Sequence, residues 1–128
     1  MRLAGFFFAA VALAFGADPP KDVGDFFVSA VRALADKDSA AFLDHFDRDM
    51  PGIAAFRGDV IALVDRAEVV STVGFVTDEG DDSRRTLQLD WYVQIDADRP
   101  KRQIVKCTIQ RQGKKWKIVA FEPLDLFK

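Results

Sequence analysis

The chain has 128 residues, enough for one domain, and its formal charge of −2 argues against a nucleic-acid-binding protein, which would show a basic stripe. Twelve phenylalanines can supply a sizeable hydrophobic core. Cys107 is the single cysteine, so no internal disulfide can form and the core alone must hold the domain together.

The first sixteen residues have the pattern of an export signal. Arg2 precedes a short apolar segment, and Ala14 and Gly16 are the small residues that a signal peptidase requires before its cut. The apolar segment is shorter than the ~18 residues expected of a membrane-spanning helix, and a retained anchor is the alternative. We therefore expect a signal at 1–16, a linker at 17–21 and an exported domain at 22–128. That domain would be periplasmic or secreted, with no stable membrane span after cleavage.

Helical spacing of apolar residues begins directly after the linker and runs from Val23 to Leu34. Asp18 or Asp22 can cap the start of this helix by accepting hydrogen bonds from its first backbone amides. Asp38 is expected to cap a second helix, which is short and contains the pair Phe42 and Phe46.

Met50-Pro51-Gly52 ends the second helix, and a third helical pattern follows. Gly58 interrupts that pattern. We therefore expect a loose turn and then a helix from about Asp59 to Arg66.

The period of the sequence changes to two after Ala67, as in β-strands. We expect strands at 68–77, 84–96, 102–112 and 115–122, the last two joined by a tight turn at Gly113. Helices followed by an antiparallel meander predict an α+β fold, with N-terminal helices packed on one face of a four-stranded sheet.

Alternation assigns side chains to the two faces of this sheet. The inner face, toward the helices, is expected to hold Leu87, Leu89, Trp91, Val93, Ile95, Val105, Cys107, Ile109, Trp116, Ile118 and Ala120. The outer face is expected to hold Asp90 among polar residues, together with the apolar Tyr92, Ile104, Val119 and Phe121. Such a mixed face is typical of a homodimer interface, with a solvated sheet as the alternative.

The order of elements resembles the nuclear transport factor 2-like superfamily, a curved cystatin-like α+β cone that includes SnoaL-like cyclases and ketosteroid isomerase. The resemblance rests on Leu34-Ala35-Asp36-Lys37-Asp38, Leu89-Asp90-Trp91 and the closing Gly113-Lys114-Lys115-Trp116-Lys117-Ile118-Val119, and it covers 22–128. It also implies dimerisation through the open sheet. The family contains isomerases, dehydratases, cyclases and non-enzymatic binders, so the resemblance implies a fold rather than an activity.

Catalysis of the ketosteroid isomerase type would need a carboxylate base in an apolar pocket. Asp90 and Tyr92 are the tempting pair, but alternation turns them away from the face that the helices cover. We therefore assign no catalytic residue and interpret the two as solvated or facing a dimer partner.

No metal or cofactor site is expected. His45 stands alone among aspartates and matches no zinc spacing, so a cap at a helix end or an ion pair is the simpler interpretation. Residues 78–82 are acidic but lack the spacing of a calcium loop.

A cone closed by helices can enclose an apolar pocket, and a filled core is the alternative. The candidates for its wall are Phe27, Leu34, Phe46, Leu89, Trp91 and Trp116. The sequence thus favours an exported, non-catalytic domain that binds a small apolar ligand or another protein. The alternative is a small-molecule isomerase, dehydratase or cyclase with a carboxylate in its pocket.

Overall fold

The structure is a computed structural model, and it describes residues 19–128. The expected signal at 1–16 and the possible capping residue Asp18 lie outside these residues. The described elements, in chain order, are α2 (Lys21–Ala35), α3 (Ser39–Leu43), α4 (Ile53–Arg66), β1 (Val69–Gly80), β2 (Arg84–Ile95), β3 (Lys101–Gln112) and β4 (Lys115–Glu122).

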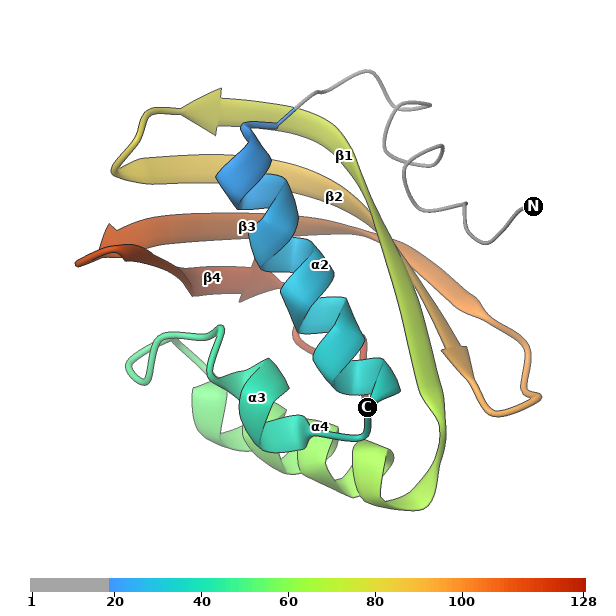
Figure 1. The fold of residues 1–128 in the computed structure, drawn as a ribbon. Helices are drawn as coiled ribbons and strands as arrows, with labels where there is room; N and C mark the ends of the chain where they lie inside the picture. Colours follow the sequence, from blue (N-terminus) through green and yellow to red (C-terminus); the bar gives the residue numbers. More distant parts are fainter. Residues whose placement is uncertain (1–18) are drawn as a thin grey trace.

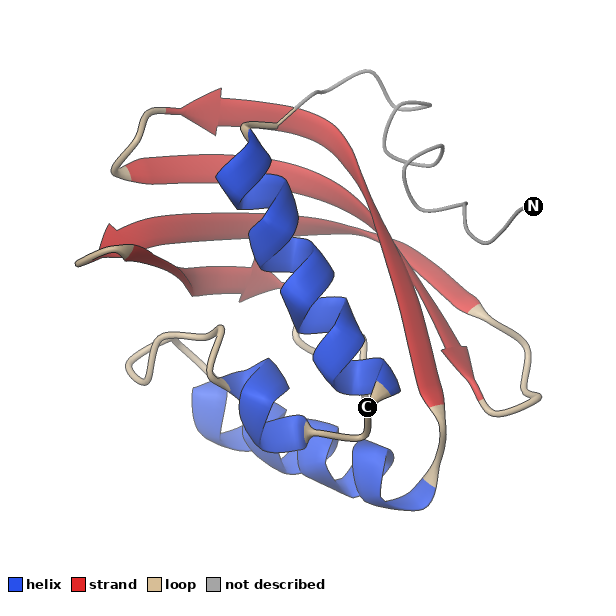
Figure 2. Ribbon diagram, viewed as in Figure 1, coloured by secondary structure: helices blue, strands red, loops and turns tan. Residues whose placement is uncertain are grey.

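The four strands form one antiparallel sheet in the order β1-β2-β3-β4, which confirms the predicted meander and the α+β class. Figure 1 shows that the sheet is strongly curved and that α2 lies across its inner side. The helices α3 and α4 lie together at one end of the sheet, so the helices of residues 19–128 gather on the same side (Figure 2).

The helix ends depart from the prediction in two places. Asp38 caps α3 as expected, its carboxylate accepting a hydrogen bond from the backbone N–H of Ala41 at 3.0 Å. The start of α2 has no side-chain cap, because its N-cap residue is Pro20; Asp22 lies inside the first turn, and its carboxylate accepts from Trp116. The third helix begins at Ile53 rather than near Asp59.

Gly58 therefore lies inside α4 instead of preceding it. A glycine costs a helix about 1 kcal/mol relative to alanine. Burial of the apolar side of α4, which includes Phe56, Val60 and Leu63, outweighs that cost because each such side chain contributes about 1.5–3 kcal/mol.

The inner face of the sheet is the floor of the hydrophobic core. Trp91 of β2 is fully buried, and rings from α2, β4 and the C-terminal tail surround it: Phe27, Phe121 and Phe127. Its indole N–H donates to the hydroxyl of Ser71 on β1 at 3.1 Å. The sequence pattern did not reveal Ser71 or the burial of Phe127.

A β-bulge in β4 overturns part of the predicted facing. Thr108 of β3 pairs with Ala120, but the next residue, Ile109, pairs with Ile118, so Val119 is an extra residue in β4. An extra residue reverses the alternation beyond it. Val119 and Ala120 are both half-buried, and Ala120 is not the inward residue that alternation predicted.

The prediction that Phe121 lies on the outer face was therefore wrong. Phe121 is 2% exposed, and its ring centroid lies 5.6 Å from that of Trp91 and 5.5 Å from that of Phe56. It is a core residue that joins β4 to α4.

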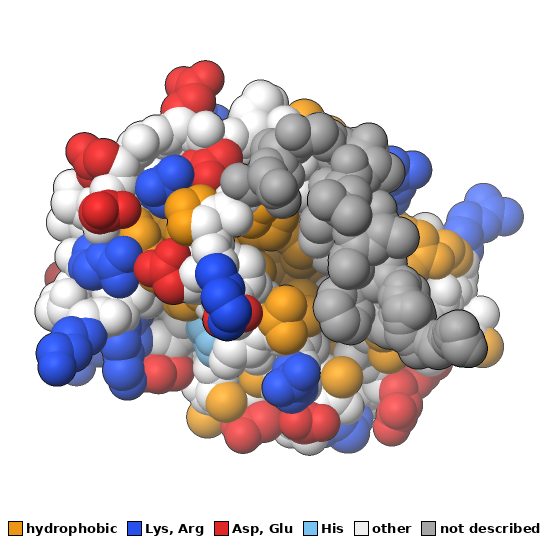
Figure 3. Space-filling view, turned by 45° about the horizontal axis from the view of Figure 1, so that its top comes forward, with side chains coloured by type: hydrophobic (Ala, Val, Ile, Leu, Met, Phe, Trp, Pro, Cys, Tyr) orange, Lys and Arg blue, Asp and Glu red, His pale blue; other side chains and the backbone are white. Residues whose placement is uncertain are grey.

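Charges of both signs are distributed over the surface of the domain. Figure 3 shows basic and acidic side chains interspersed with apolar ones on the face it presents. In the segment 19–128, none of the helices has the length and apolar character to cross a bilayer.

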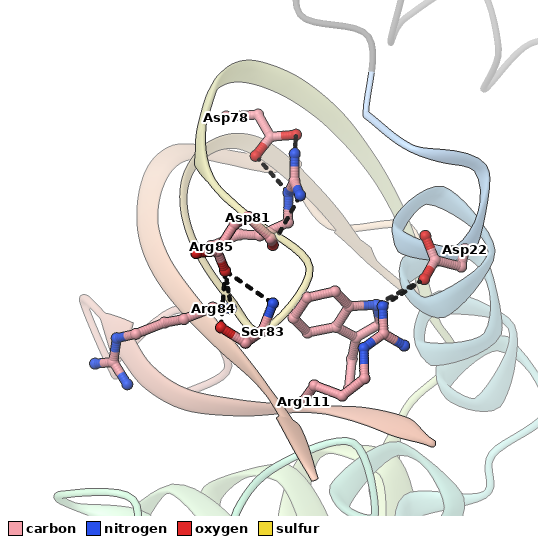
Figure 4. Close-up of polar contacts among 8 residues, drawn as sticks. Asp22, Asp78, Asp81, Ser83, Arg84, Arg85 and Arg111 are labelled. Carbon is pink, nitrogen blue, oxygen red and sulfur yellow. Dashed lines mark hydrogen bonds and ion pairs between the residues drawn. The ribbon is translucent and has the colours of Figure 1, made fainter. Parts of the chain in front are cut away.

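Acidic residues at the end of β1 and in the turn that follows it stabilise the hairpin of β1 and β2. The carboxylate of Asp81 accepts hydrogen bonds from the backbone N–H groups of Ser83 and Arg84, and Asp78 pairs with the guanidinium of Arg85 (Figure 4). These carboxylates therefore serve the hairpin between β1 and β2.

Asp22 joins the first turn of α2 to the hairpin of β3 and β4. Its carboxylate accepts from the indole N–H of Trp116 at 3.1 Å and from the guanidinium of Arg111 at 3.0 Å (Figure 4). The same guanidinium lies 4.2 Å from the centroid of the Trp116 ring, in a cation–π contact. The hydrogen bond from Trp116, followed by that from Arg111, holds the pKa of Asp22 below its ordinary value.

We predict that Phe121→Ala destabilises the protein by about 3–5 kcal/mol, because it opens a cavity beside Trp91. Val119→Ala, at the bulge, is the matched control and should cost less than about 1 kcal/mol. Urea unfolding followed by tryptophan fluorescence measures both. A smaller loss for Phe121→Ala than for Val119→Ala would contradict the inward position of Phe121.

We predict that Asp22 makes the protein sensitive to acid. Folding lowers the pKa of Asp22, so the ionised carboxylate stabilises the folded protein. This stabilisation is fully present above the pKa of the unfolded state, about 3.9, and is lost as the pH falls through the pKa of the folded state. Asp22→Asn keeps an oxygen acceptor for Trp116 but loses the charge, so its stability should fall less steeply than that of the wild type between about pH 5 and 3.

Urea unfolding at a series of pH values tests this expectation. Asp25→Asn is the control, because Asp25 lies on the same helix and pairs with the exposed Lys21. Parallel stability profiles for the wild type and Asp22→Asn would show that Asp22 is not the group responsible.

Candidate functional site

The outer face of the sheet carries the carboxylate that the sequence singled out. Asp90 lies between Leu89 and Trp91, which both face the helices, so its own side chain points to the other side as predicted. It is nevertheless only 4% exposed, and the expectation that it is solvated was wrong.

Burial of Asp90 is compensated by Arg102 of β3. The guanidinium Nη2 lies 2.6 Å from Oδ2 of Asp90 and Nε lies 2.9 Å from Oδ1, which is a two-point contact. The hydrogen bond and charge of Asp90 raise the pKa of Arg102, so the cation remains charged. The oxygens of Asp90 are thus committed to Arg102 and are poorly placed to accept a proton from a substrate.

The inner face offers no carboxylate in its place. Within residues 19–128, the buried polar side chains are Ser71, Asp90 and Thr108. Of these, Ser71 is on the inner face and its hydroxyl is bonded to Trp91. Tyr92, the second member of the tempting pair, is exposed on the outer face beside Arg102.

The six side chains predicted to line an inner pocket are all buried: Phe27, Leu34, Phe46, Leu89, Trp91 and Trp116. They pack against one another or against neighbouring aromatic rings, as when Phe46 lies 4.9 Å from Phe56 and 5.6 Å from Phe121 between ring centroids. In the described residues all six belong to the core of the domain, and Trp116 also lines the groove described next.

A groove of about 340 Å³ lies where α2, α3 and β4 meet. Its lining mixes aromatic, basic and small polar side chains: Phe26, Ser29, Ala41, Asp44, His45, Lys115, Trp116 and Lys117. The volume is at the small end of the range of ligand pockets, which is about 300–1,000 Å³. Sequence reasoning missed this groove because its residues come from three separate elements.

His45 is the central polar group of the groove. Its Nδ1 lies 2.9 Å from the carbonyl oxygen of Ala41 and 3.2 Å from that of Phe42, so Nδ1 carries a hydrogen and donates it. Its Nε2 lies 3.2 Å from the hydroxyl of Ser29 on α2. The ring also contacts Phe26, with 5.0 Å between centroids.

The position of His45 agrees with the helix-end role expected from the sequence. Its Nδ1 satisfies carbonyl groups at the end of α3, and the Nε2 contact links α3 to α2. Within residues 19–128, no group of His, Cys, Asp and Glu side chains is arranged to hold a metal ion. Cys107 is fully buried, and burial raises the pKa of its thiol, so the reactive thiolate is disfavoured.

The two lysines of the groove are engaged differently. Lys117 donates to the backbone oxygen of Asp44 and lies 3.5 Å from its carboxylate, so these two charges compensate each other. Lys115 is exposed and has no ion-pair partner in the described part of the chain. The groove therefore has one uncompensated positive charge at its rim.

Comparison with known proteins shows no matching family model and no matching curated protein. Solved structures do match. A protein of unknown function from Shewanella oneidensis, described as NTF-2 like, has a TM-score of 0.63 at 10% identity, with 81% of this chain and 97% of that chain covered. A candidate scytalone dehydratase from Novosphingobium aromaticivorans has a TM-score of 0.68 at 8% identity, with 79% of each chain covered.

Bd1075 of Bdellovibrio bacteriovorus matches 80% of this chain with a TM-score of 0.66 and 15% identity, but this chain spans only 40% of that protein. At these identities the likeness concerns the fold and carries no activity across. It agrees with the α+β arrangement described above, an antiparallel four-stranded meander with helices on one side. The chain has the nuclear transport factor 2-like, cystatin-like fold.

Proposed function

We propose that this protein is an exported, non-catalytic domain that binds a small ligand. The observation that carries the non-catalytic part is the position of Asp90. A ketosteroid isomerase-like or dehydratase-like reaction needs a carboxylate in an apolar pocket. Asp90 is the one buried carboxylate of the described residues, and it lies on the outer face in a two-point contact with Arg102.

The groove between α2, α3 and β4 supports the binding part of the proposal. It combines half-buried rings with a few polar groups of fixed orientation, which is the usual composition of a small-molecule site. Export is supported by the apolar segment after Arg2 and the small residues near position 16, which follow the pattern of a cleaved signal.

We predict that native mass spectrometry of the protein purified from its own host detects a bound small molecule that is recovered chemically unchanged. Adding that molecule at about 100 times its Kd should stabilise the fold by about 2.7 kcal/mol, seen as a rise in Tm. Asp90→Asn should bind it as the wild type does.

The competing enzymatic function would give a different result. Conversion of the molecule by the wild type, through loss of water or migration of a double bond, and its absence in Asp90→Asn would overturn the non-catalytic proposal. Circular dichroism of Asp90→Asn would confirm that the variant remains folded.

We also propose that two copies associate through the outer face of the sheet. Val70, Tyr92 and Ile104 are exposed apolar side chains on this face, and Ile104 is 53% exposed. Tyr92 is paired with Arg102 across β2 and β3, and tyrosine and arginine are enriched at the centres of interfaces. Val119 lies at the bulge of β4, whereas Phe121 is part of the core and cannot contribute to this face.

We predict that Ile104→Asp weakens this dimer by roughly 2 kcal/mol or more, because it buries a charge in the interface without a partner. Light scattering over a range of concentrations measures the change. Ile61→Asp is the control, since Ile61 is an exposed apolar residue on α4, away from the outer face. A monomeric wild type at all concentrations, or equal effects of the two variants, would argue against the interface.

A further inference from the structure

We infer that the groove between α2, α3 and β4 binds a small planar monoanion, such as an aromatic carboxylate. This inference rests on the proposed ligand-binding function and adds the position of the site and the class of its ligand.

The positive charge at the rim of the groove selects an anion. Lys117 and Asp44 compensate each other through their ion pair, whereas Lys115 has no such partner within residues 19–128. Two lysines and one aspartate leave the lining with a net charge of +1 before any proton on Nε2 of His45 is counted. A single carboxylate on the ligand would balance this charge.

The floor of the groove selects a flat apolar body. Phe26 and His45 are half-buried, and their rings meet edge to face with 61° between their planes. Trp116 completes the lining, and its indole is held by Arg111 of β3 and by Asp22 of α2. A planar ring can contact these aromatic surfaces while its carboxylate remains near Lys115.

The polar groups of the floor are already oriented. Because Nδ1 of His45 must donate to backbone carbonyl groups, neutral His45 presents Nε2 as an acceptor, and the hydroxyl of Ser29 donates to it. The lone pairs of the Ser29 oxygen then remain available for a donor on the ligand. Because these side chains are already held in place, less conformational entropy is lost when a ligand binds.

The test titrates benzoate, benzamide and inorganic phosphate into the ¹⁵N-labelled protein and follows the amide and indole N–H signals by NMR. We expect benzoate to shift the Trp116 indole signal and the amides of 115–117, with a Kd of about 1–10 mM, as befits a ligand of this size. Benzamide, which has the same shape without the charge, should bind about fivefold more weakly. Phosphate, which has charge without the ring, should bind more weakly still.

Matched variants test whether Lys115, at the rim of the groove, causes the preference for benzoate over benzamide. Lys115→Gln should remove the fivefold preference for benzoate and leave benzamide binding unchanged, whereas Lys114→Gln should keep the wild-type preference because Lys114 does not line the groove. Ser29→Phe should abolish the shifts caused by both aromatic probes, since the new ring fills the groove from an exposed helix position. Circular dichroism of each variant confirms folding.

Three results would overturn the inference. Equal affinities for benzoate and benzamide, or equal effects of Lys114→Gln and Lys115→Gln, would show that the groove does not select an anion. Probe-induced shifts confined to residues outside the groove would show that the site is elsewhere. These results would leave the proposed ligand-binding function intact if native mass spectrometry still detects a molecule retained from the host. If no molecule is retained, the proposed function itself is contradicted.

Discussion

Burial of Trp91 is the interaction on which the rest of the structure depends. Its ring meets Phe27 from α2, Phe121 from β4 and Phe127 from the C-terminal tail, so one side chain joins the helices, the sheet and the end of the chain. Its indole N–H would cost about 1–3 kcal/mol if it were buried without an acceptor. The hydroxyl of Ser71 on β1 supplies that acceptor and favours the observed register of β1 against β2.

The same burial determines which face of the sheet carries Asp90. Because side chains alternate along β2, an inward Trp91 places Asp90 on the outer face, where it cannot meet a ligand held under the helices. A carboxylate at that buried position needs a compensating charge, and Arg102 on the adjacent strand provides it in two-point geometry. The pairing of Asp90 with Arg102 therefore follows from the burial of Asp90 on the outer face of the sheet.

The sequence predicted the parts of the fold that depend on regular periodicity. Alternation located β2 and β3 and their inward residues, and helical spacing located α2. It failed at Phe121, because a bulge at Val119 shifts the register without leaving a glycine or proline signal. It failed also at Asp22, which was expected to cap α2. Its carboxylate instead accepts a hydrogen bond from Trp116 on β4, a strand that is distant in the sequence. Contacts of this kind depend on tertiary structure, and local patterns do not encode them.

The groove arises from the way the helices are joined to the edge of the sheet. The outer edge of β4 has free backbone groups, and the segment after α3 satisfies two of them: the backbone N–H of Ile118 donates to the carbonyl of His45, and the N–H of Asp47 donates to the carbonyl of Ile118. This pairing fixes the backbone of His45 against β4, while its side chain reaches back to Ser29 on α2. The groove lies at this junction of α2, α3 and β4. Since the groups that surround the groove are polar or charged at its rim and aromatic at its floor, the junction that closes the fold also has the composition of a binding site.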